Sequence, residues 1–287
     1  VFLNGTRDSV RTEETNLGNL TADANLFIAR QTDQTAVLSL KNGGGIRDNI
    51  GAISASSGSL NPNDVRRLPP PANPLAGKLE GDISQLDIAN SLRFNNSLSL
   101  VTVTATQLKE IFERGVAGVR PGATPGSFPQ VGGVSFSFDA TRAARVAANN
   151  ATAATVAGDR IRNLVITDAD GDTTQVVVQN GQIVGDPSRT FRIVTLGFIA
   201  DGGDDYPFPL FAAQNPTLVN RVNLPTEVAE QAAFADYIST KFPGGNFVFN
   251  EADVTASRDF RIQNLASFAD NVVSFAQRDF QFDTFNR

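Results

Sequence analysis

Hydrophobic residues recur at helical spacing in the segment that follows residue 15. They are Leu17, Leu20, Ala24, Phe27 and Ile28. A repeat of three to four residues places them on one face of a helix, and Thr15 or Asn16 can cap its amino end. The spacing therefore predicts a helix over residues 17–29. The apolar run that comes next predicts a strand over residues 35–40.

A second strand and helix are predicted near residue 100. Apolar and polar residues alternate over 97–103, as in a half-buried strand. Thr104 and Gln107 then have the spacing of a capping box, which marks the start of a helix. The apolar residues that follow lie on one helix face: Leu108, Ile111, Phe112 and Val116.

Strand patterns dominate the chain beyond residue 133. The strand-like segments are GVSFSFD, IRNLVITD, TTQVVVQ and TFRIVTLGF. Asn180-Gly181 is a hairpin-turn signal. We expect another helix from about residue 225 to 239, and a last one over 266–275. The segment from Asp168 resembles the start of a calcium loop. However, Thr173 replaces the required glycine and Gln179 replaces the bidentate glutamate, so we interpret the segment as a turn.

These patterns predict an α+β fold in one domain over residues 1–287. Residues 52–80 are rich in Ser, Pro and Asn and predict an irregular insertion. The tail over residues 243–287 has a weaker pattern, and we find neither an internal repeat nor a linker.

Composition excludes several kinds of chemistry. The chain has 287 residues and contains neither Cys nor His. Disulfides, thiolate zinc sites and cysteine nucleophiles are therefore excluded. The lack of His also excludes a Ser-His-Asp triad, a histidine base and His-ligated metals. The first residues lack an initiator Met and a basic-then-apolar leader, so we expect a processed or excised piece.

The charges argue against general nucleic-acid binding, because the net charge is −6. No apolar run reaches the roughly eighteen residues that a membrane span needs. The basic residues are 20 Arg and four Lys. Arginine forms bidentate bonds to phosphate and carboxylate, but composition alone favours a biased genome or an adapted secreted surface as the explanation of this ratio.

Five blocks of sequence, in order, resemble a known family. They are VRTEETNLGNLTADA; NGGGIRDNI; GDISQLDI with LRFNNSLSLVTVTATQLKEIFERGV; GSFPQVGGVSFSFD; and TFRIVTLGFIADGGDDYPF. Together they resemble the C-terminal, nucleotide-binding domain of the bacterial and animal 5′-nucleotidases. The resemblance runs from about residue 7 to residue 208. It implies a single 5′-nucleotidase C-terminal-like domain, with a mixed sheet and packed helices.

The resemblance also implies a substrate-binding site for a nucleotide or nucleoside. It matches Arg7, Arg11 and Arg47 to the phosphate, and Phe94 and Phe198 to the two faces of the base. It matches Asn96 and Gly126 to the base site, and Asp204 to the ribose hydroxyls. Charge-assisted bonds suit phosphate, and aromatic rings stack on any base.

Each residue type also has an ordinary structural explanation. Arginines, an aspartate and a glycine are common in surface loops, asparagine is common in turns, and most phenylalanines are core residues. Asp205 departs from the family, which usually has glycine there. The three glycines after the first strand favour either a tight turn or a close approach to the backbone. We expect them to turn Arg47 toward an anion.

The resemblance further implies that hydrolysis belongs to a separate N-terminal metallophosphoesterase domain with two divalent metals. None of its motifs occurs in this chain, so we expect no catalytic residue, metal or cofactor here. The chain then supplies the substrate-binding half of a secreted hydrolase of nucleotide catabolism, in the periplasm or outside the cell. A metallophosphoesterase domain in the same parent chain is its expected partner. The alternatives are a standalone nucleotide binder and an exported structural, surface or filament protein that reuses the fold.

Overall fold

The computed structural model describes residues 1–55, 64–168, 172–267 and 269–273. Its α-helices are α1 (Asn16–Thr32), α2 (Gln85–Ser91), α3 (Ala105–Val116), α4 (Gly197–Ala200), α5 (Phe208–Gln214), α6 (Pro216–Val219) and α7 (Glu230–Lys241). The strands are β1 (Ala36–Asn42), β2 (Ala52–Ser54), β3 (Arg66–Leu68), β4 (Leu98–Thr104), β5 (Pro129–Gly132), β6 (Val134–Phe138), β7 (Ile161–Thr167), β8 (Thr173–Gln179), β9 (Gln182–Ile183), β10 (Thr190–Leu196), β11 (Val222–Asn223) and β12 (Ile262–Asn264).

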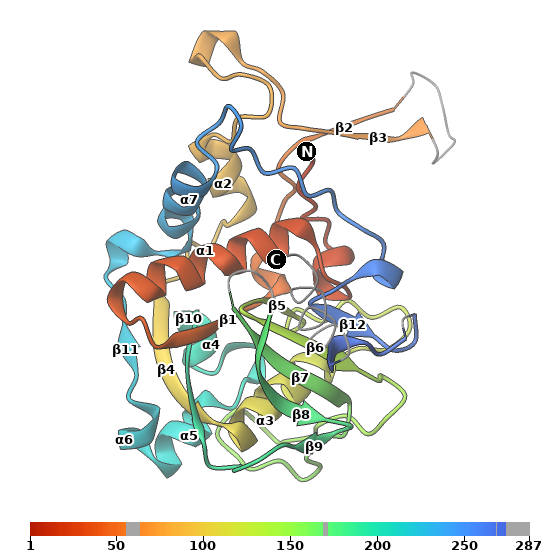
Figure 1. Ribbon diagram of the computed structural model, residues 1–287, viewed down its shortest axis with the longest axis vertical. Coiled ribbons are helices and arrows are strands. Elements are labelled where there is room, and N and C mark those ends of the chain that lie inside the picture. Colours follow the sequence, from red (N-terminus) through yellow and green to blue (C-terminus); the bar gives the residue numbers. More distant parts are fainter. Residues whose placement is uncertain (56–63, 169–171, 268, 274–287) are drawn as a thin grey trace, which may run out of the picture.

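Two five-stranded sheets form the body of the molecule (Figure 1). The strand order of the first sheet is β11-β4-β10-β1-β5, and that of the second is β12-β6-β7-β8-β9. Each sheet is mixed, because β1 runs parallel to β10 and β12 runs parallel to β6, while the other pairs are antiparallel. Gly133, with φ of 70°, connects β5 to β6 and so passes the chain from one sheet to the other.

Helices pack against the first sheet, and one of them, α3, also contacts the second. Helix α1 packs on β1 and β5 and also contacts α7, whereas α3 contacts β4, β5 and β10 of the first sheet and β7 of the second. The main core therefore contains residues of α3 and of both sheets, including Phe112, Phe128 and Phe136. A second apolar cluster joins α1, α2 and α7 through Leu20, Ile88 and Phe234. The architecture confirms the predicted α+β domain with a mixed sheet and packed helices.

The local patterns of the sequence are confirmed where they were strong. Thr15 caps α1 by accepting a hydrogen bond from the Gly18 amide. Thr104 and Gln107 form both bonds of the predicted capping box of α3. Asn180 and Gly181, with φ of 51° and 84°, form the hairpin turn between β8 and β9. The predicted helix from residue 225 divides into a short 3₁₀ turn, Thr226–Val228, and α7.

Two predicted segments lie partly outside the described residues. The turn that follows Asp168 includes residues 169–171, which the structure does not describe, but its flanking strands β7 and β8 are antiparallel neighbours. The predicted last helix over 266–275 includes residues 268, 274 and 275, which are likewise not described. Within the described part of this range, residues 266 and 267 belong to a turn, and residues 272 and 273 are helical.

The Ser- and Pro-rich insertion has more regular structure than the sequence predicts. Strands β2 and β3 pair antiparallel, with Ala52 opposite Leu68 and Ser54 opposite Arg66. This ribbon extends away from the two sheets (Figure 1). Its side chains are mostly exposed, including Ile53 and Leu68. A hairpin with no apolar face to bury leaves little hydrophobic signal in its sequence, which is why composition alone indicated an irregular loop.

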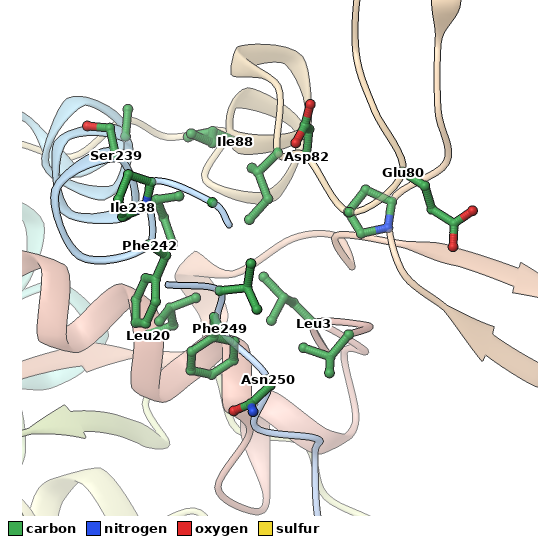
Figure 2. Close-up of a pocket in the computed structure, with 18 of the residues that line it drawn as sticks. Leu3, Leu20, Glu80, Asp82, Ile88, Ile238, Ser239, Phe242, Phe249 and Asn250 are labelled. Carbon is green, nitrogen blue, oxygen red and sulfur yellow. The ribbon is translucent and has the colours of Figure 1, made fainter. Parts of the chain in front are cut away.

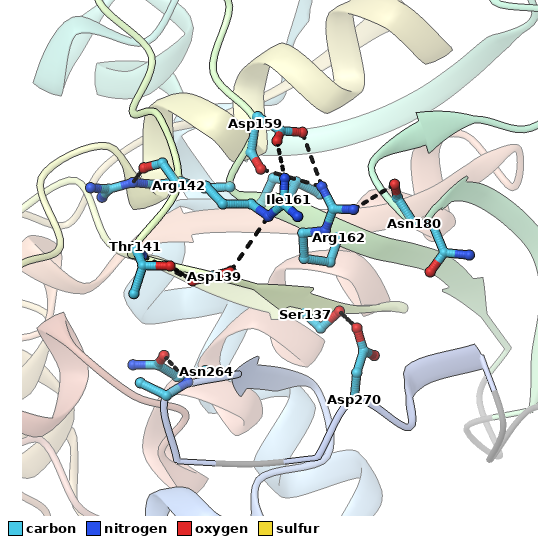
Figure 3. Close-up of polar contacts among 12 residues, drawn as sticks. Ser137, Asp139, Thr141, Arg142, Asp159, Ile161, Arg162, Asn180, Asn264 and Asp270 are labelled. Carbon is cyan, nitrogen blue, oxygen red and sulfur yellow. Dashed lines mark hydrogen bonds and ion pairs between the residues drawn. The ribbon is translucent and has the colours of Figure 1, made fainter.

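Polar side chains secure the strand ends of the second sheet (Figure 3). Arg162 on β7 donates to Asp159 Oδ1 at 3.0 Å and to the Asn180 carbonyl at 2.6 Å, so it connects the β8–β9 turn to β7. Ser137 on β6 donates to Asp270 at 2.8 Å. At least one of the chain's many arginines, Arg162, therefore has a structural role.

Candidate functional site

The three glycines form a 3₁₀ turn, Gly43–Gly45, directly after β1. The Gly44 amide donates to the Gly126 carbonyl at 2.9 Å. A Cβ on Gly44 would lie 2.9 Å from that same carbonyl oxygen, and a Cβ on Gly43 would overlap the carbonyl of Val10. Close backbone approach, rather than a positive φ, therefore requires glycine at these positions. The turn brings the segments that carry Arg11 and Gly126 against the end of β1.

The three predicted arginines lie within electrostatic range of one another. Arg11 is 8% exposed, at the end of the 3₁₀ turn Ser9–Arg11, whereas Arg7 and Arg47 are exposed. Burial and then repulsion from Arg7 and Arg47 lower the pKa of Arg11, while Asp204 and Asp8 act in the opposite direction. Three arginines within electrostatic range of one another, against the two carboxylates of Asp204 and Asp8, leave an excess of positive charge, which favours an anion.

Arg11 keeps bonding capacity for such an anion. One of its terminal nitrogens donates to the Thr124 carbonyl at 3.3 Å. Its Nε is buried and has no hydrogen-bond partner among the described residues. Arg47 Nη1 donates to the Gly44 carbonyl at 3.3 Å, so the glycine turn also orients that side chain. Buried donors rarely stay unpaired, so we expect a water or an anion to accept from Arg11 Nε.

Asp204 lies beside these arginines, and contacts hold both its side chain and its backbone carbonyl. Asn42 Nδ2 donates to Asp204 Oδ2 at 2.6 Å, and Arg114 Nε donates to the Asp204 carbonyl at 2.8 Å. A Cβ on Gly126 would lie 3.6 Å from Asp204 Oδ2, so Gly126 faces this carboxylate. Asp204 and Asp205 both adopt the left-handed region, with φ of 52° and 57°. This conformation is unusual for residues other than glycine, and it sets the direction of the Asp204 side chain.

Both predicted stacking residues present their rings to solvent. Phe94 is 62% exposed and Phe198 is 46% exposed, so neither is a core residue. The Arg47 guanidinium lies 5.6 Å from the centroid of the Phe94 ring, which joins the arginine group to this aromatic residue. A Cβ on Gly203 would overlap the Phe198 ring, so Phe198 packs directly against the loop that carries Asp204. Exposed aromatic rings beside charged groups are typical of binding surfaces.

Asn96 has an intramolecular partner. Its Nδ2 donates to Glu230 Oε1 at 2.9 Å, and its backbone amide donates to the same oxygen at 3.0 Å. A carboxylate only accepts hydrogen bonds, so this contact fixes which way the Asn96 amide is turned. The Asn96 side chain keeps its Oδ1 and its second Nδ2 hydrogen for other partners.

Sequence reasoning missed two residues of this site, Asn42 and Arg114. Asn42 is 5% exposed, and its Oδ1 has no hydrogen-bond partner among the described residues. Its place directly before the glycines was the available signal. Arg114 lies in the last turn of α3, where nothing in the local pattern points to Asp204, which is 90 residues away. Distant contacts of this kind have no sequence signature.

The large cavity shown in Figure 2 lies elsewhere and contains none of the predicted site residues. Its volume is about 720 Å³, and α1, α2, α7 and the segment after α7 contribute to its lining. Leu20, Ile88, Ile238 and Phe249 are among the apolar residues that line it. Among the described residues, no group of His, Cys, Asp or Glu side chains could hold a metal ion. Nor is any described helix long and apolar enough to cross a membrane.

Fold and site together define an α+β domain with a corner of three arginines beside exposed aromatic rings. Residues 2–213 match the family described as 5′-nucleotidase, C-terminal domain, and the chain therefore belongs to that family. The match covers all eight predicted site residues.

Curated relatives and solved structures agree with this assignment. The chain is 28% identical, over 88% of its length, to the trifunctional nucleotide phosphoesterase protein YfkN of Bacillus subtilis, of which it covers 14%. It is 27% identical to human 5′-nucleotidase over 72% of the chain and 29% of that protein. A 5′-nucleotidase precursor from Thermus thermophilus superposes with a TM-score of 0.60 and 25% identity, over 92% of this chain and 38% of that one. The chain thus spans well under half the length of these relatives.

Proposed function

We propose that this chain binds a nucleotide or nucleoside and is the substrate-specificity domain of a 5′-nucleotidase-type phosphohydrolase. One observation carries the proposal. Arg7, Arg11 and Arg47 converge with Asp204 at the glycine turn, although they come from three separate segments. A phosphate suits the cationic side of this corner, because charge-assisted bonds to phosphate are strong. The nearby carboxylate suits a ribose diol, which donates hydrogen bonds.

The exposed rings of Phe94 and Phe198 complete the proposed site. Arg47 contacts Phe94, and Phe198 packs against the Asp204 loop, so the aromatic residues adjoin both polar groups. A base bound there gains about 1–3 kcal/mol from stacking on an aromatic ring. The named relatives that act on nucleotides make the same ligand class the natural expectation.

We further propose that this chain does not hydrolyse its ligand. It contains no His, and the metal site of the family belongs to an N-terminal domain. A metallophosphoesterase domain in the same parent chain would supply the reaction. We place the parent protein in the periplasm or outside the cell, as a secreted enzyme of nucleotide catabolism.

A thermal-shift panel tests the proposed binding. AMP, adenosine, ribose 5-phosphate and inorganic phosphate are compared on the wild type and on Asp204→Ala. Saturating AMP at a hundredfold excess over Kd adds about 2.7 kcal/mol of stability, which raises Tm by about 5 °C. Asp204→Ala should lose most of the shift.

Asp201→Ala is the matched control, because it removes an exposed acid of the same loop that pairs with Arg221 instead. It should keep the AMP shift. If no nucleotide or nucleoside shifts the wild type, the binding proposal is wrong, and the result favours an exported structural, surface or filament protein that reuses the fold.

A further inference from the structure

The first turn of α7 holds the loop that carries Phe94. Glu230 Oε1 accepts both the backbone amide and the Nδ2 of Asn96, and the Glu230 amide donates back to the Asn96 carbonyl at 3.0 Å. The next residue, Gln231, adds two bonds. Its Nε2 donates to the Leu92 carbonyl at 2.8 Å, and its amide donates to Asn95 Oδ1 at 3.2 Å. Both sides of Phe94 are therefore anchored to α7.

These anchors hold the backbone on both sides of Phe94 in place. Asn95 has a φ of 43°, in the left-handed region. Asparagine adopts this region more readily than most residues other than glycine, and the bond from the Gln231 amide to Asn95 Oδ1 holds its side chain there. Phe94 itself is 62% exposed and has little packing to fix its backbone. The position of its ring thus depends on the hydrogen bonds made by residues 92, 95 and 96.

Glu230 also reaches the other side of the site. Its second oxygen, Oε2, lies 3.2 Å from Lys41 Nζ, and the two side chains are 1% and 0% exposed. Lys41 is on β1, two residues before the glycine turn that orients Arg47. One buried carboxylate therefore joins the strand that leads to the arginines with the loop that carries Phe94. Lys41 and Glu230 are 189 positions apart in the sequence.

The stretch that matches the family ends at residue 213, so α7 lies beyond it. We propose that Glu230 and Gln231 are positioning residues, which set the place of the Phe94 ring and thereby the affinity for the base of the ligand. The proposal rests on the proposed function for its ligand, but its structural part can be tested without one. It assigns the segment after residue 213 a role in ligand selection.

The sharpest test compares two double variants that differ at one residue. Lys41→Met/Glu230→Gln and Lys41→Met/Glu230→Ala both remove the buried ion pair, so neither leaves an unpaired buried charge. Glutamine keeps an oxygen that can accept from Asn96, whereas alanine does not. A difference between the two variants therefore excludes the ion pair as its cause and reports the loss of the bonds to Asn96, together with the smaller side chain of alanine.

Two readouts separate positioning from general stability. Hydrogen exchange at the Asn96 amide, followed by NMR without ligand, should be at least about tenfold faster in the alanine variant than in the glutamine variant, because local opening exposes that amide. The alanine variant should also bind AMP about tenfold or more weakly than the glutamine variant, from lost stacking. Both should bind ribose 5-phosphate equally, since that ligand has no base.

Single variants provide an independent check that leaves the ion pair intact. Gln231→Ala should weaken AMP binding without changing the affinity for ribose 5-phosphate. Glu227→Gln, an exposed position one turn earlier, should change neither affinity. Equal hydrogen exchange in the two double variants would overturn the proposal, and so would equal losses for AMP and ribose 5-phosphate. If the wild type binds neither ligand, the proposed function fails, while hydrogen exchange still decides the positioning role.

Discussion

At the residue scale, Asp204 and Asp205 adopt a strained backbone conformation that also sets the direction of the Asp204 side chain. The two adjacent acids both have positive φ values, of 52° and 57°. Asp204 is secured by Asn42 and Arg114, but the Asp205 side chain is 66% exposed and makes a salt bridge of 3.4 Å with Arg114. Such exposed pairs contribute little, about 0–1 kcal/mol. The strain at Asp205 is thus poorly compensated by its own contacts.

Asp205→Gly should therefore be more stable than Asp205→Ala. Both substitutions remove the same salt bridge, but only glycine relieves the left-handed strain, which costs an L-residue about 1–2 kcal/mol. The difference in the free energy of unfolding should be about 1 kcal/mol, measured by urea denaturation. Equal stabilities of the two variants would show that the loop carries no strain at this position.

Arg47 offers a second test at the residue scale, because it adjoins both the arginine group and Phe94. Arg47→Ala should weaken binding of AMP more than that of adenosine, since only AMP carries a phosphate. We expect a differential of about 1.5–3 kcal/mol, the value of bonds to charged groups. Arg120→Ala, at another exposed arginine, is the control and should affect neither ligand. Calorimetric titration gives both affinities, and equal losses for the two ligands would place Arg47 away from the phosphate.

At the scale of elements, carboxylates dock the C-terminal segment onto the start of α1. Glu14 Oε2 accepts hydrogen bonds from the amides of residues 260, 261 and 262, and Asp253 accepts one from the Asn16 amide. Asp259 Oδ2 accepts from the Glu14 amide, while its Oδ1 is buried without a partner among the described residues. Burial and repulsion from Glu14 raise the pKa of Asp259 from 3.8 to about 8.

This raised pKa predicts a pH dependence with a defined sign. Between pH 3.8 and about 8 the folded protein keeps a proton on Asp259 that the unfolded chain releases, so stability falls as pH rises across that window. Asp259→Asn, which stays neutral, should remove this dependence. Its stability relative to the wild type should rise by about 2–4 kcal/mol from pH 5 to pH 9, since each pKa unit is worth about 1.4 kcal/mol. Urea unfolding at both pH values measures this, and a constant difference would contradict it.

The same scale shows what the sequence could predict. The helices and strands with clear periodicity and caps, such as α1 and α3, were predicted because their signals are local. The β2–β3 ribbon was not, since it buries no apolar face. The candidate site residues came from ordered motifs of a resembling family. Neither the Asn42–Asp204 bond nor the Lys41–Glu230 pair could be predicted, because they join residues 162 and 189 positions apart. Only the folded chain brings such partners together.

At the scale of the whole molecule, the family assignment points to a nucleotide ligand, whereas the residues needed for metal-dependent hydrolysis are not found in the described chain. The family match and the arginine corner favour a nucleotide ligand, but the chain has no His and covers only a fraction of its relatives. Two-metal hydrolysis needs a metal-activated water between properly held ions. Among the described residues no group of His, Cys, Asp or Glu could hold such an ion. We therefore expect this chain to bind a nucleotide without hydrolysing it.

The purified chain should accordingly release no phosphate from AMP, ADP or ATP, even with Mg²⁺, Mn²⁺ or Zn²⁺ added at millimolar concentration. The same preparation should still show the AMP-dependent rise in Tm, so that inactivity cannot be attributed to misfolding. Inorganic phosphate, followed over hours at high protein concentration, gives the readout. Asp204→Ala is the decisive control against a contaminating phosphatase, because it weakens binding at the proposed site only. Metal-dependent release that disappears in Asp204→Ala would mean that this domain carries catalytic groups of its own.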